Sequence, residues 1–136
     1  MTTTPNLADL VLAQTTDAVV YAGRDGRIAI WNAASEALFG FTAGEALGQS
    51  LDLIIPERLR AAHWSGFDAA LASGRTRLAG RPSLTRAVHK DGRKLYVEMT
   101  FALVKDDAGA VLGSVAIARD VTERVEKERA AAAPKS

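Results

Sequence analysis

His63 is the side chain of this sequence best suited to bind a metal. It lies in the strongest helical segment, residues 56–74. Leu59 and Phe67 stand four residues before and after it, so the three side chains share one face of that helix. A histidine on an apolar face offers one basic nitrogen to a metal from a water-poor wall. The same spacing also suits a half-buried histidine whose ring binds a backbone carbonyl group, so both interpretations stay open.

Met99 is the second side chain with ligand chemistry. It lies in a predicted strand, residues 93–105, in which apolar and polar residues alternate and one face is buried. A thioether can bind a metal, but a methionine in such a strand also serves as a core residue that fills irregular gaps. The apolar face consists of Leu95, Val97, Met99, Phe101 and Leu103.

Other reactive combinations cannot be read from the sequence. His89 is expected to be an exposed turn residue, and two histidines 26 residues apart without neighbouring acids make a poor metal site. There is no serine–histidine–acid arrangement and no glycine-rich phosphate loop. With 0 cysteines, thiolate nucleophiles, thiolate metal ligands and cysteinyl flavin adducts are excluded. We therefore expect no enzymatic activity.

The composition is that of one globular domain. The chain has 136 residues, 48% hydrophobic and 24% charged, which is enough for a single core. Its net charge of +1 gives no electrostatic preference for nucleic acid or an anionic membrane. No apolar stretch approaches the roughly 20 residues of a membrane span, and the lack of cysteine fits a reducing compartment. We expect a cytoplasmic protein without direct contacts to nucleic acid or membrane.

Helix and turn signals alternate in the first half of the chain. An Asp-Gly step at residues 25–26 allows a tight reversal between two strands. Asn32 can cap the helix after this hairpin and Gly40 can end it. In the longest helix, Pro56 suits a position in the first turn and Gly74 can end the helix. The predicted elements are a helix from Leu7, strands over residues 18–22 and 27–32, a helix over residues 33–39, a capping box over residues 42–45 and a helix over residues 56–74.

Three extended segments and a helix make up the second half. Turn sequences at residues 91–92 and 106–109 join the segments into an antiparallel meander. Local strand pairing then predicts an α+β fold, a five-stranded antiparallel sheet with short helices on one face and a ligand cavity between them. The segments cover residues 77–90, 93–105 and 111–119, and the helix covers residues 122–133. We divide the chain into a flexible leader (1–6), one domain (7–121) and a C-terminal signalling helix with a tail (122–136).

Several motifs resemble those of the PAS sensory domain. They are Asp25-Gly-Arg-Ile-Ala-Ile-Trp-Asn32-Ala-Ala-Ser35, Phe39-Gly40, Gly44-Glu45, Gly48, Ile55-Pro56, Lys90-Asp-Gly92 and Arg119-Asp-Val-Thr-Glu123. The resemblance extends from Leu7 to Glu126. It implies a PAS fold with strand order 2-1-5-4-3, signal sensing without catalysis, and dimerisation through flanking helices.

The central part is similar to the haem-binding PAS domains of the FixL type. The similarity rests on Pro56-Glu57, His63, Phe67, Gly74 and Lys90-Asp-Gly92. It implies that His63 ligates haem iron and that Met99 lies on the distal side, where its thioether could be a sixth ligand. Phe101, Leu78 and Leu84 would complete the distal pocket, although they are equally good core residues.

The chain departs from the FixL pattern at two positions. Ser83 stands where those domains carry the arginine that hydrogen-bonds bound oxygen, and Ala69 replaces a helix arginine that contacts a haem propionate. An arginine cluster lies nearby and could pair with carboxylates, although it also suits a solvated strand edge. Its members are Arg75, Arg77, Arg81 and Arg86, of which Arg77 and Arg81 are our candidate binding residues.

Together these patterns predict a sensor that binds b-type haem through His63 and reports a diatomic gas (O2, CO or NO) or a redox change. The partners expected are a second copy of the chain and a histidine kinase or transcription regulator in trans. Two alternatives stay open. One is an interaction module with a filled core, which would contact its partner through Leu7, Leu10, Val11 and the C-terminal helix. The other is a domain for a small organic acid, whose carboxylate would pair with the arginines.

Overall fold

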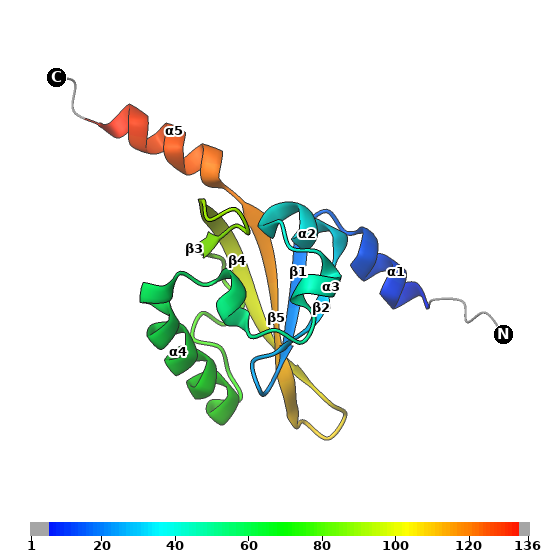
Figure 1. The fold of residues 1–136 in the computed structure, drawn as a ribbon. Coiled ribbons are helices and arrows are strands. Elements are labelled where there is room, and N and C mark those ends of the chain that lie inside the picture. Colours follow the sequence, from blue (N-terminus) through cyan, green and yellow to red (C-terminus); the bar gives the residue numbers. More distant parts are fainter. Residues whose placement is uncertain (1–5, 134–136) are drawn as a thin grey trace.

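The computed structural model of the chain describes residues 6–133. It confirms the predicted fold, because five antiparallel strands form one sheet in the order β2-β1-β5-β4-β3 (Figure 1). The strands are β1 (Ala18–Gly23), β2 (Ile28–Trp31), β3 (Ser83–Val88), β4 (Lys94–Lys105) and β5 (Val111–Asp120). The helices are α1 (Leu7–Gln14), α2 (Ala33–Phe39), α3 (Ala43–Ala46), α4 (Arg60–Ser73) and α5 (Thr122–Ala132), with the 3-10 turns η1 (Leu51–Ile54) and η2 (Glu57–Leu59) before α4. Residues 1–5 of the predicted leader and 134–136 of the predicted tail lie outside the described part.

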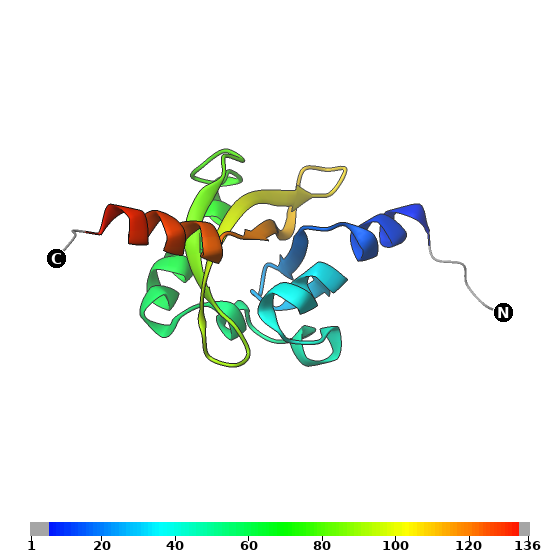
Figure 2. The same cartoon turned by 90° about the horizontal axis from the view of Figure 1, so that it is seen from above.

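The helices α2, α3 and α4 lie on the same side of the sheet, whereas α1 and α5 extend at opposite ends of the molecule (Figure 2). The largest fully buried hydrophobic side chains are Phe39, Ile28, Leu95 and Val97. The core therefore lies between the inner face of the sheet and the helices that cover it. Within residues 6–133, no helix is long and apolar enough to cross a bilayer.

Asn32 joins three elements of the first half. Its buried Oδ1 accepts hydrogen bonds from the backbone N–H groups of Val19 (2.9 Å) and Ser35 (3.0 Å) and from the Ser35 hydroxyl (2.8 Å). Its Nδ2 donates to the carbonyl oxygens of Leu12 (3.0 Å) and Asp17 (3.1 Å). Asn32 therefore caps α2 as predicted and also binds α1 and β1, which the sequence alone does not indicate.

Further caps and turns stabilise the first half of the chain. The Asn6 side chain accepts a hydrogen bond at the start of α1, and the capping box between Thr42 and Glu45 is complete. Gly26 in the hairpin turn has φ +75° and Gly40 after α2 has φ +83°, a left-handed backbone that favours glycine. These signals were readable because each depends on residues close together in the chain.

The third strand is shorter than predicted. β3 begins at Ser83, whereas the sequence predicts an extended segment from Arg77. Residues 76–81 instead form two turns closed by backbone hydrogen bonds. Ala79 (φ +50°) and Gly80 (φ +81°) have left-handed backbone angles, which end an extended conformation. The prediction of a strand over residues 77–82 was therefore wrong.

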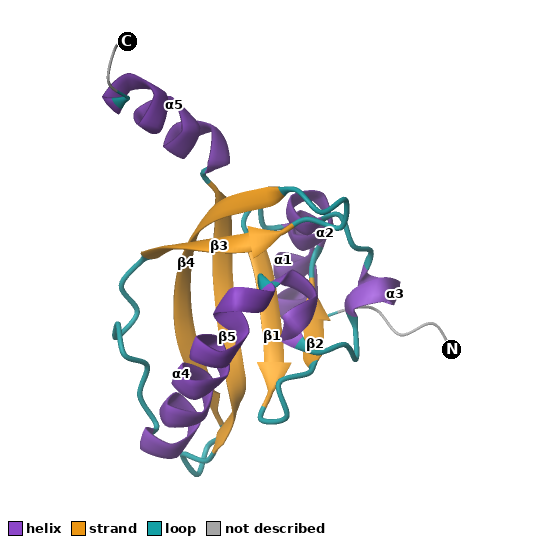
Figure 3. Ribbon diagram, turned by 60° about the vertical axis from the view of Figure 1, so that its left-hand side comes forward, coloured by secondary structure: helices purple, strands orange, loops and turns teal. Residues whose placement is uncertain are grey.

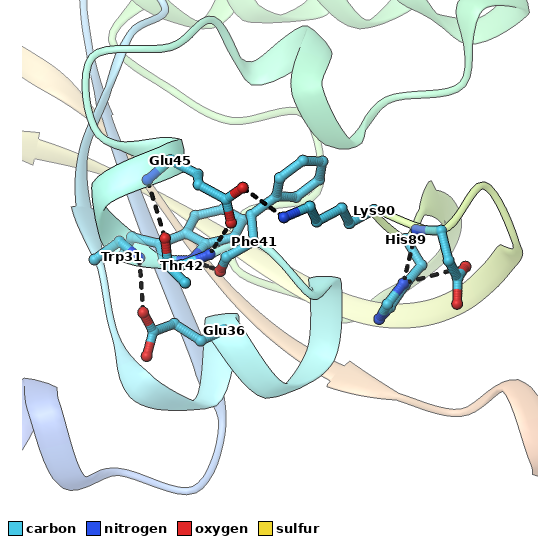
Figure 4. A network of polar contacts seen from close by, with 9 residues as sticks. Trp31, Glu36, Phe41, Thr42, Glu45, His89 and Lys90 are labelled. Carbon is cyan, nitrogen blue, oxygen red and sulfur yellow. Dashed lines mark hydrogen bonds and ion pairs between the residues drawn. The ribbon is translucent and has the colours of Figure 1, made fainter.

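The turn between β3 and β4 is bound to α2 and α3 (Figure 4). The Lys90 ammonium pairs with the Glu45 carboxylate, and the Lys90 N–H donates to the Phe39 carbonyl oxygen (2.9 Å). The hydrogen bond from Lys90 holds the pKa of Glu45 below its usual value. His89 is not the exposed residue that the sequence predicts, because its ring packs against Gly40 and leaves no room for a β-carbon there.

Tyr96 of β4 binds the C-terminal helix α5. Its backbone N–H donates to Thr122 Oγ1 (2.9 Å), and its carbonyl oxygen accepts from the Val121 N–H (2.9 Å). The Arg129 guanidinium of α5 lies 4.9 Å from the centre of the Tyr96 ring, and that of Arg86 on β3 lies 5.3 Å from it. Tyr96 therefore connects the edge strand β3 with α5.

Asn32→Ala should lower the free energy of unfolding by about 3 kcal/mol, because it leaves the buried Val19 N–H without an acceptor and α2 without its cap. Urea denaturation followed by circular dichroism measures this change. Asn6→Ala is the matched control, since Asn6 is also an N-cap but is exposed, and we expect a loss of about 1 kcal/mol or less. Equal losses in the two variants would contradict the role of Asn32 as a junction.

Candidate functional site

A cavity of about 560 Å³ lies between α4 and the inner face of the sheet. Its walls are mainly apolar, and an apolar cavity of this volume is typical of a site for a small molecule or cofactor. Figure 3 shows α4 in front of the strands that form the opposite wall. The predicted site residues that line it are Leu59, His63, Phe67, Arg77, Leu78, Leu84, Met99 and Phe101.

Helix α4 covers this cavity without fully burying any of its own side chains. It begins at Arg60, after η2, and not at Pro56 as predicted, and none of residues 60–73 is fully buried. Phe67 and Ala70 line the cavity and are only partly buried. An apolar ligand in the cavity would bury these surfaces, and each Å² removed from water contributes about 25 cal/mol.

His63 lies on the helical wall of the cavity and is half-buried. Its ring centre is 4.7 Å from the Trp64 ring and 6.0 Å from the Phe67 ring. The His63 Nδ1 atom is buried and has no hydrogen-bond partner among residues 6–133. Buried polar atoms without a partner are rare and indicate a group that binds there, such as a ligand or a water molecule. The backbone carbonyl partner that the sequence left open is not bound to this nitrogen.

Burial lowers the pKa of His63 below its ordinary value, and the nearby Asp52 carboxylate partly opposes this by favouring the protonated ring. Burial is the larger effect, so the neutral imidazole is favoured. Only a neutral imidazole has a lone pair available for a metal. His63 is therefore in the protonation state that ligation needs at neutral pH.

The sheet forms the opposite wall through Met99 and Phe101 of β4, as the alternating pattern predicts. Met99 is 7% exposed and pairs with Ser83 on β3 and with Ala118 on β5. Ser83 also lines the cavity, so it adds a hydroxyl group beside the thioether. His63 and Met99 therefore lie on the two walls of one cavity.

The candidate arginines have different positions. Arg77 lines the cavity, whereas exposed Arg81 lies outside its lining and donates from Nε to the Leu78 carbonyl oxygen (3.1 Å). Leu84 borders the cavity but pairs with Glu98, on the opposite face of β4 from Met99 and Phe101, and is 56% exposed. It is therefore an edge residue and not the distal core residue that the sequence predicts.

Sequence analysis missed one pair of residues beside His63. The Trp64 Nε1–H donates to Asp52 Oδ1 at 2.8 Å and links α4 with η1. No local pattern indicates this contact, because it joins side chains 12 residues apart across two turns. Arg86 belongs to the arginine cluster named from the sequence but was not among the candidate binding residues, and the structure places it at the edge of the cavity and against Tyr96.

Within residues 6–133, no group of three or more histidine, cysteine or acidic side chains could hold a metal ion. A bare ion needs about four protein ligands, whereas haem iron needs one or two because the porphyrin supplies the others. The isolated His63 is consequently better suited to haem than to a free metal ion.

Comparison with known proteins identifies the domain. Residues 12–126 match a family model described as the PAS fold. The chain belongs to the PAS-fold family. The crystal structure of a PAS domain from Colwellia psychrerythraea aligns with a TM-score of 0.75 at 24% identity, over 86% of this chain and 96% of that one. An RNA-binding light-oxygen-voltage receptor aligns with a TM-score of 0.70 at 24% identity, over 95% and 39% of the two chains. At these identities the structural neighbours show the fold of this PAS domain.

Two curated relatives are similar to this domain in sequence. The PAS domain is 29% identical over 134 residues to the oxygen sensor protein DosP of Escherichia coli. This alignment covers 95% of this chain and 16% of DosP. It is 32% identical over 115 residues to an uncharacterised protein of Azorhizobium caulinodans. That alignment covers 84% of this chain and 15% of the relative. The chain therefore spans about one sixth of the length of these relatives.

The lowered pKa of His63 predicts that stability depends on pH. The folded protein binds the His63 proton less tightly than the unfolded chain does. The contribution of His63 to the free energy of unfolding is therefore present above about pH 6.5 and is lost as the pH falls below that value. Urea denaturation of the ligand-free protein between about pH 5 and pH 7.5 measures this loss. His63→Phe should lack that part of the pH dependence. If the free energy of unfolding depended on pH in the same way in the wild type and in His63→Phe, the assignment of this pH dependence to His63 would be wrong.

Proposed function

We propose that this PAS domain binds b-type haem through His63 and reports a diatomic gas (O2, CO or NO) or a redox change. The observation that carries the proposal is the buried, unpartnered Nδ1 atom of the half-buried His63 on the wall of an apolar cavity of about 560 Å³. Burial keeps that imidazole in its neutral form, which is the form that binds iron.

The residues around the cavity fit this cofactor. Leu59 and Phe67 lie on the same wall of the cavity as His63, and Met99 and Phe101 lie on the opposite wall. Both walls therefore offer apolar contacts to a flat macrocycle. We propose Met99 as the sixth ligand and Arg77 as the partner of a propionate. When bound, haem supplies an iron atom that can take up a gas ligand or change its oxidation state.

The relative DosP supports the proposal, because it is named an oxygen sensor and aligns with nearly the whole of this chain. This domain has Ser83 at the position of the oxygen-binding arginine of the FixL type. Ser83 lines the cavity opposite Met99 in the β3–β4 register, so its hydroxyl is a polar group available to a gas ligand. We expect the ligand to be held differently from that in FixL-type domains.

We further propose that the domain is a non-catalytic, cytoplasmic module that dimerises and signals to a histidine kinase or transcription regulator. The helix α1 supports dimerisation, because Leu7, Leu10 and Val11 are exposed on it. Output would pass through α5, which Tyr96 connects to the sheet. A change of packing in the cavity would then shift the population of α5 positions.

His63→Ala should strongly weaken the Soret absorption of protein reconstituted with haemin, because it removes the proposed iron ligand. His89→Ala is the matched control, since His89 lies outside the cavity lining, and its spectrum should match that of the wild type. Absorbance titration with haemin measures both variants. An unchanged spectrum in His63→Ala would exclude His63 as the ligand. A wild-type protein that dimerises but takes up no haemin would favour the interaction module.

A small organic acid is the second candidate ligand. Arg77 lines this mainly apolar cavity and is exposed, so its guanidinium is available to form charge-assisted hydrogen bonds with a bound carboxylate. The apolar remainder of such a molecule would lie against Leu78 and Phe101. Mass spectrometry of small molecules released from the purified protein distinguishes this candidate from haem.

Arg77→Gln should weaken binding of a carboxylate-bearing ligand by about tenfold, the effect of losing one charge-assisted hydrogen bond. Arg81→Gln is the matched control, because Arg81 lies outside the cavity lining and its effect should be small. Titration with haemin, and with any acid identified by mass spectrometry, gives the dissociation constants. Equal effects of the two substitutions would show that Arg77 is only part of a solvated edge.

A further inference from the structure

The start of α4 is held by polar contacts to Asp52 in η1. The Asp52 backbone N–H donates to Ser50 Oγ (3.1 Å), and its carbonyl oxygen accepts from Arg60 Nη2 (3.2 Å). Arg60 Nε also donates to the Ile55 carbonyl oxygen (3.1 Å). No side chain within residues 6–133 caps the start of this helix, so the two bonds of Arg60 attach its first residue to the preceding turns.

The Asp52 carboxylate makes a further contact with α4 through Trp64. Its Oδ1 accepts the hydrogen bond from the indole Nε1–H at 2.8 Å, a length typical of a charge-assisted bond. The indole ring also packs against Gly26 in the β1–β2 turn, where a β-carbon would collide with it. Trp64 is therefore fixed from two sides, by a carboxylate of η1 and by the hairpin.

Trp64 directly follows His63 in the helix, and the two rings meet edge to face with their centres 4.7 Å apart. Phe67 completes the group, 5.2 Å from the Trp64 ring and 6.0 Å from the His63 ring. Neighbouring residues of a hydrogen-bonded helix turn move together. A contact that fixes Trp64 therefore also fixes the part of α4 that carries His63.

We propose that Asp52 and Trp64 are positioning residues for His63, through the hydrogen bond between them and the negative charge that it holds beside the imidazole. This inference rests on the proposed haem site. In metal proteins, groups that orient a ligating histidine change metal affinity about 10- to 100-fold. A nearby negative charge also favours the oxidised metal and lowers its reduction potential.

Two substitutions separate these effects. Asp52→Asn keeps an oxygen acceptor for the Trp64 indole but removes the charge, whereas Trp64→Phe keeps the charge and an aromatic ring but removes the hydrogen bond. Asp68→Asn is the matched control, because it removes an exposed carboxylate from the same helix. The full chain is reconstituted with haemin, and its haem dissociation constant and midpoint potential are measured. Circular dichroism verifies that each variant is folded.

We expect Trp64→Phe to weaken haem binding about tenfold. Asp52→Asn should leave the affinity within about twofold and raise the midpoint potential, while Asp68→Asn should change neither. The proposal is overturned if Trp64→Phe binds haem as tightly as the wild type, or if Asp52→Asn and Asp68→Asn shift the potential equally.

The ligand-free protein supplies a readout that does not depend on haem. In nuclear magnetic resonance spectra, Trp64→Phe should shift the imidazole signal of His63 and leave that of His89 in place. If the wild type takes up no haemin, the proposed function fails while this shift still supports the positioning role. If the His63 signal stays in place in Trp64→Phe, the positioning role fails whatever the outcome with haemin.

Discussion

Helix α4 is attached to the domain by polar contacts of Arg60 and Trp64 near its start, and the space beneath it is not filled by side chains. A mainly apolar cavity of about 560 Å³ lies in this space, within the size range of small-molecule and cofactor sites. Arg60 and Trp64 hold the helix to η1, and this arrangement does not require the helix to bury an apolar face. A helix attached in this way can stand above a ligand site, and the ligand then supplies the apolar contacts that the chain lacks.

The rest of the domain is packed in the ordinary way. Phe39, Ile28 and Val97 are fully buried between the sheet and the short helices. Asn32 satisfies five hydrogen bonds at the junction of α1, β1 and α2. The ion pair between Lys90 and Glu45 closes this side by binding the β3–β4 turn to α3. The covered face of the sheet is thus filled by side chains near α2 and open near α4. The candidate iron ligands, His63 and Met99, lie in the open part.

The elements that sequence analysis predicted correctly are those with local signals. Glycines at turns, caps such as Asn32 and the alternation around Met99 involve residues that are close in the chain, so the antiparallel hairpins and the faces of β4 followed from them. The strand order followed from the resemblance to PAS domains, because it includes the long-range pairing of β1 with β5. The strand over residues 77–82 was wrong because Ala79 adopts a left-handed backbone, which its residue type does not indicate. Leu84 was predicted to complete the distal pocket but lies at its border, because the pairing of β3 with β4 places it opposite Glu98. The contact between Asp52 and Trp64 was out of reach, since only the path of the chain through two turns brings these side chains together.

The position of α5 has a mechanical consequence. The helix extends away from the sheet, and its 11 residues make a rod about 16 Å long at 1.5 Å per residue (Figure 1). Its base is bonded to the backbone of Tyr96, while Arg129 contacts the ring of the same residue farther along the helix. If that ring contact loosens, a tilt of about 10° at the base displaces the far end by about 3 Å. A rod of this length thereby enlarges a small rotation at its base into a larger displacement at its far end.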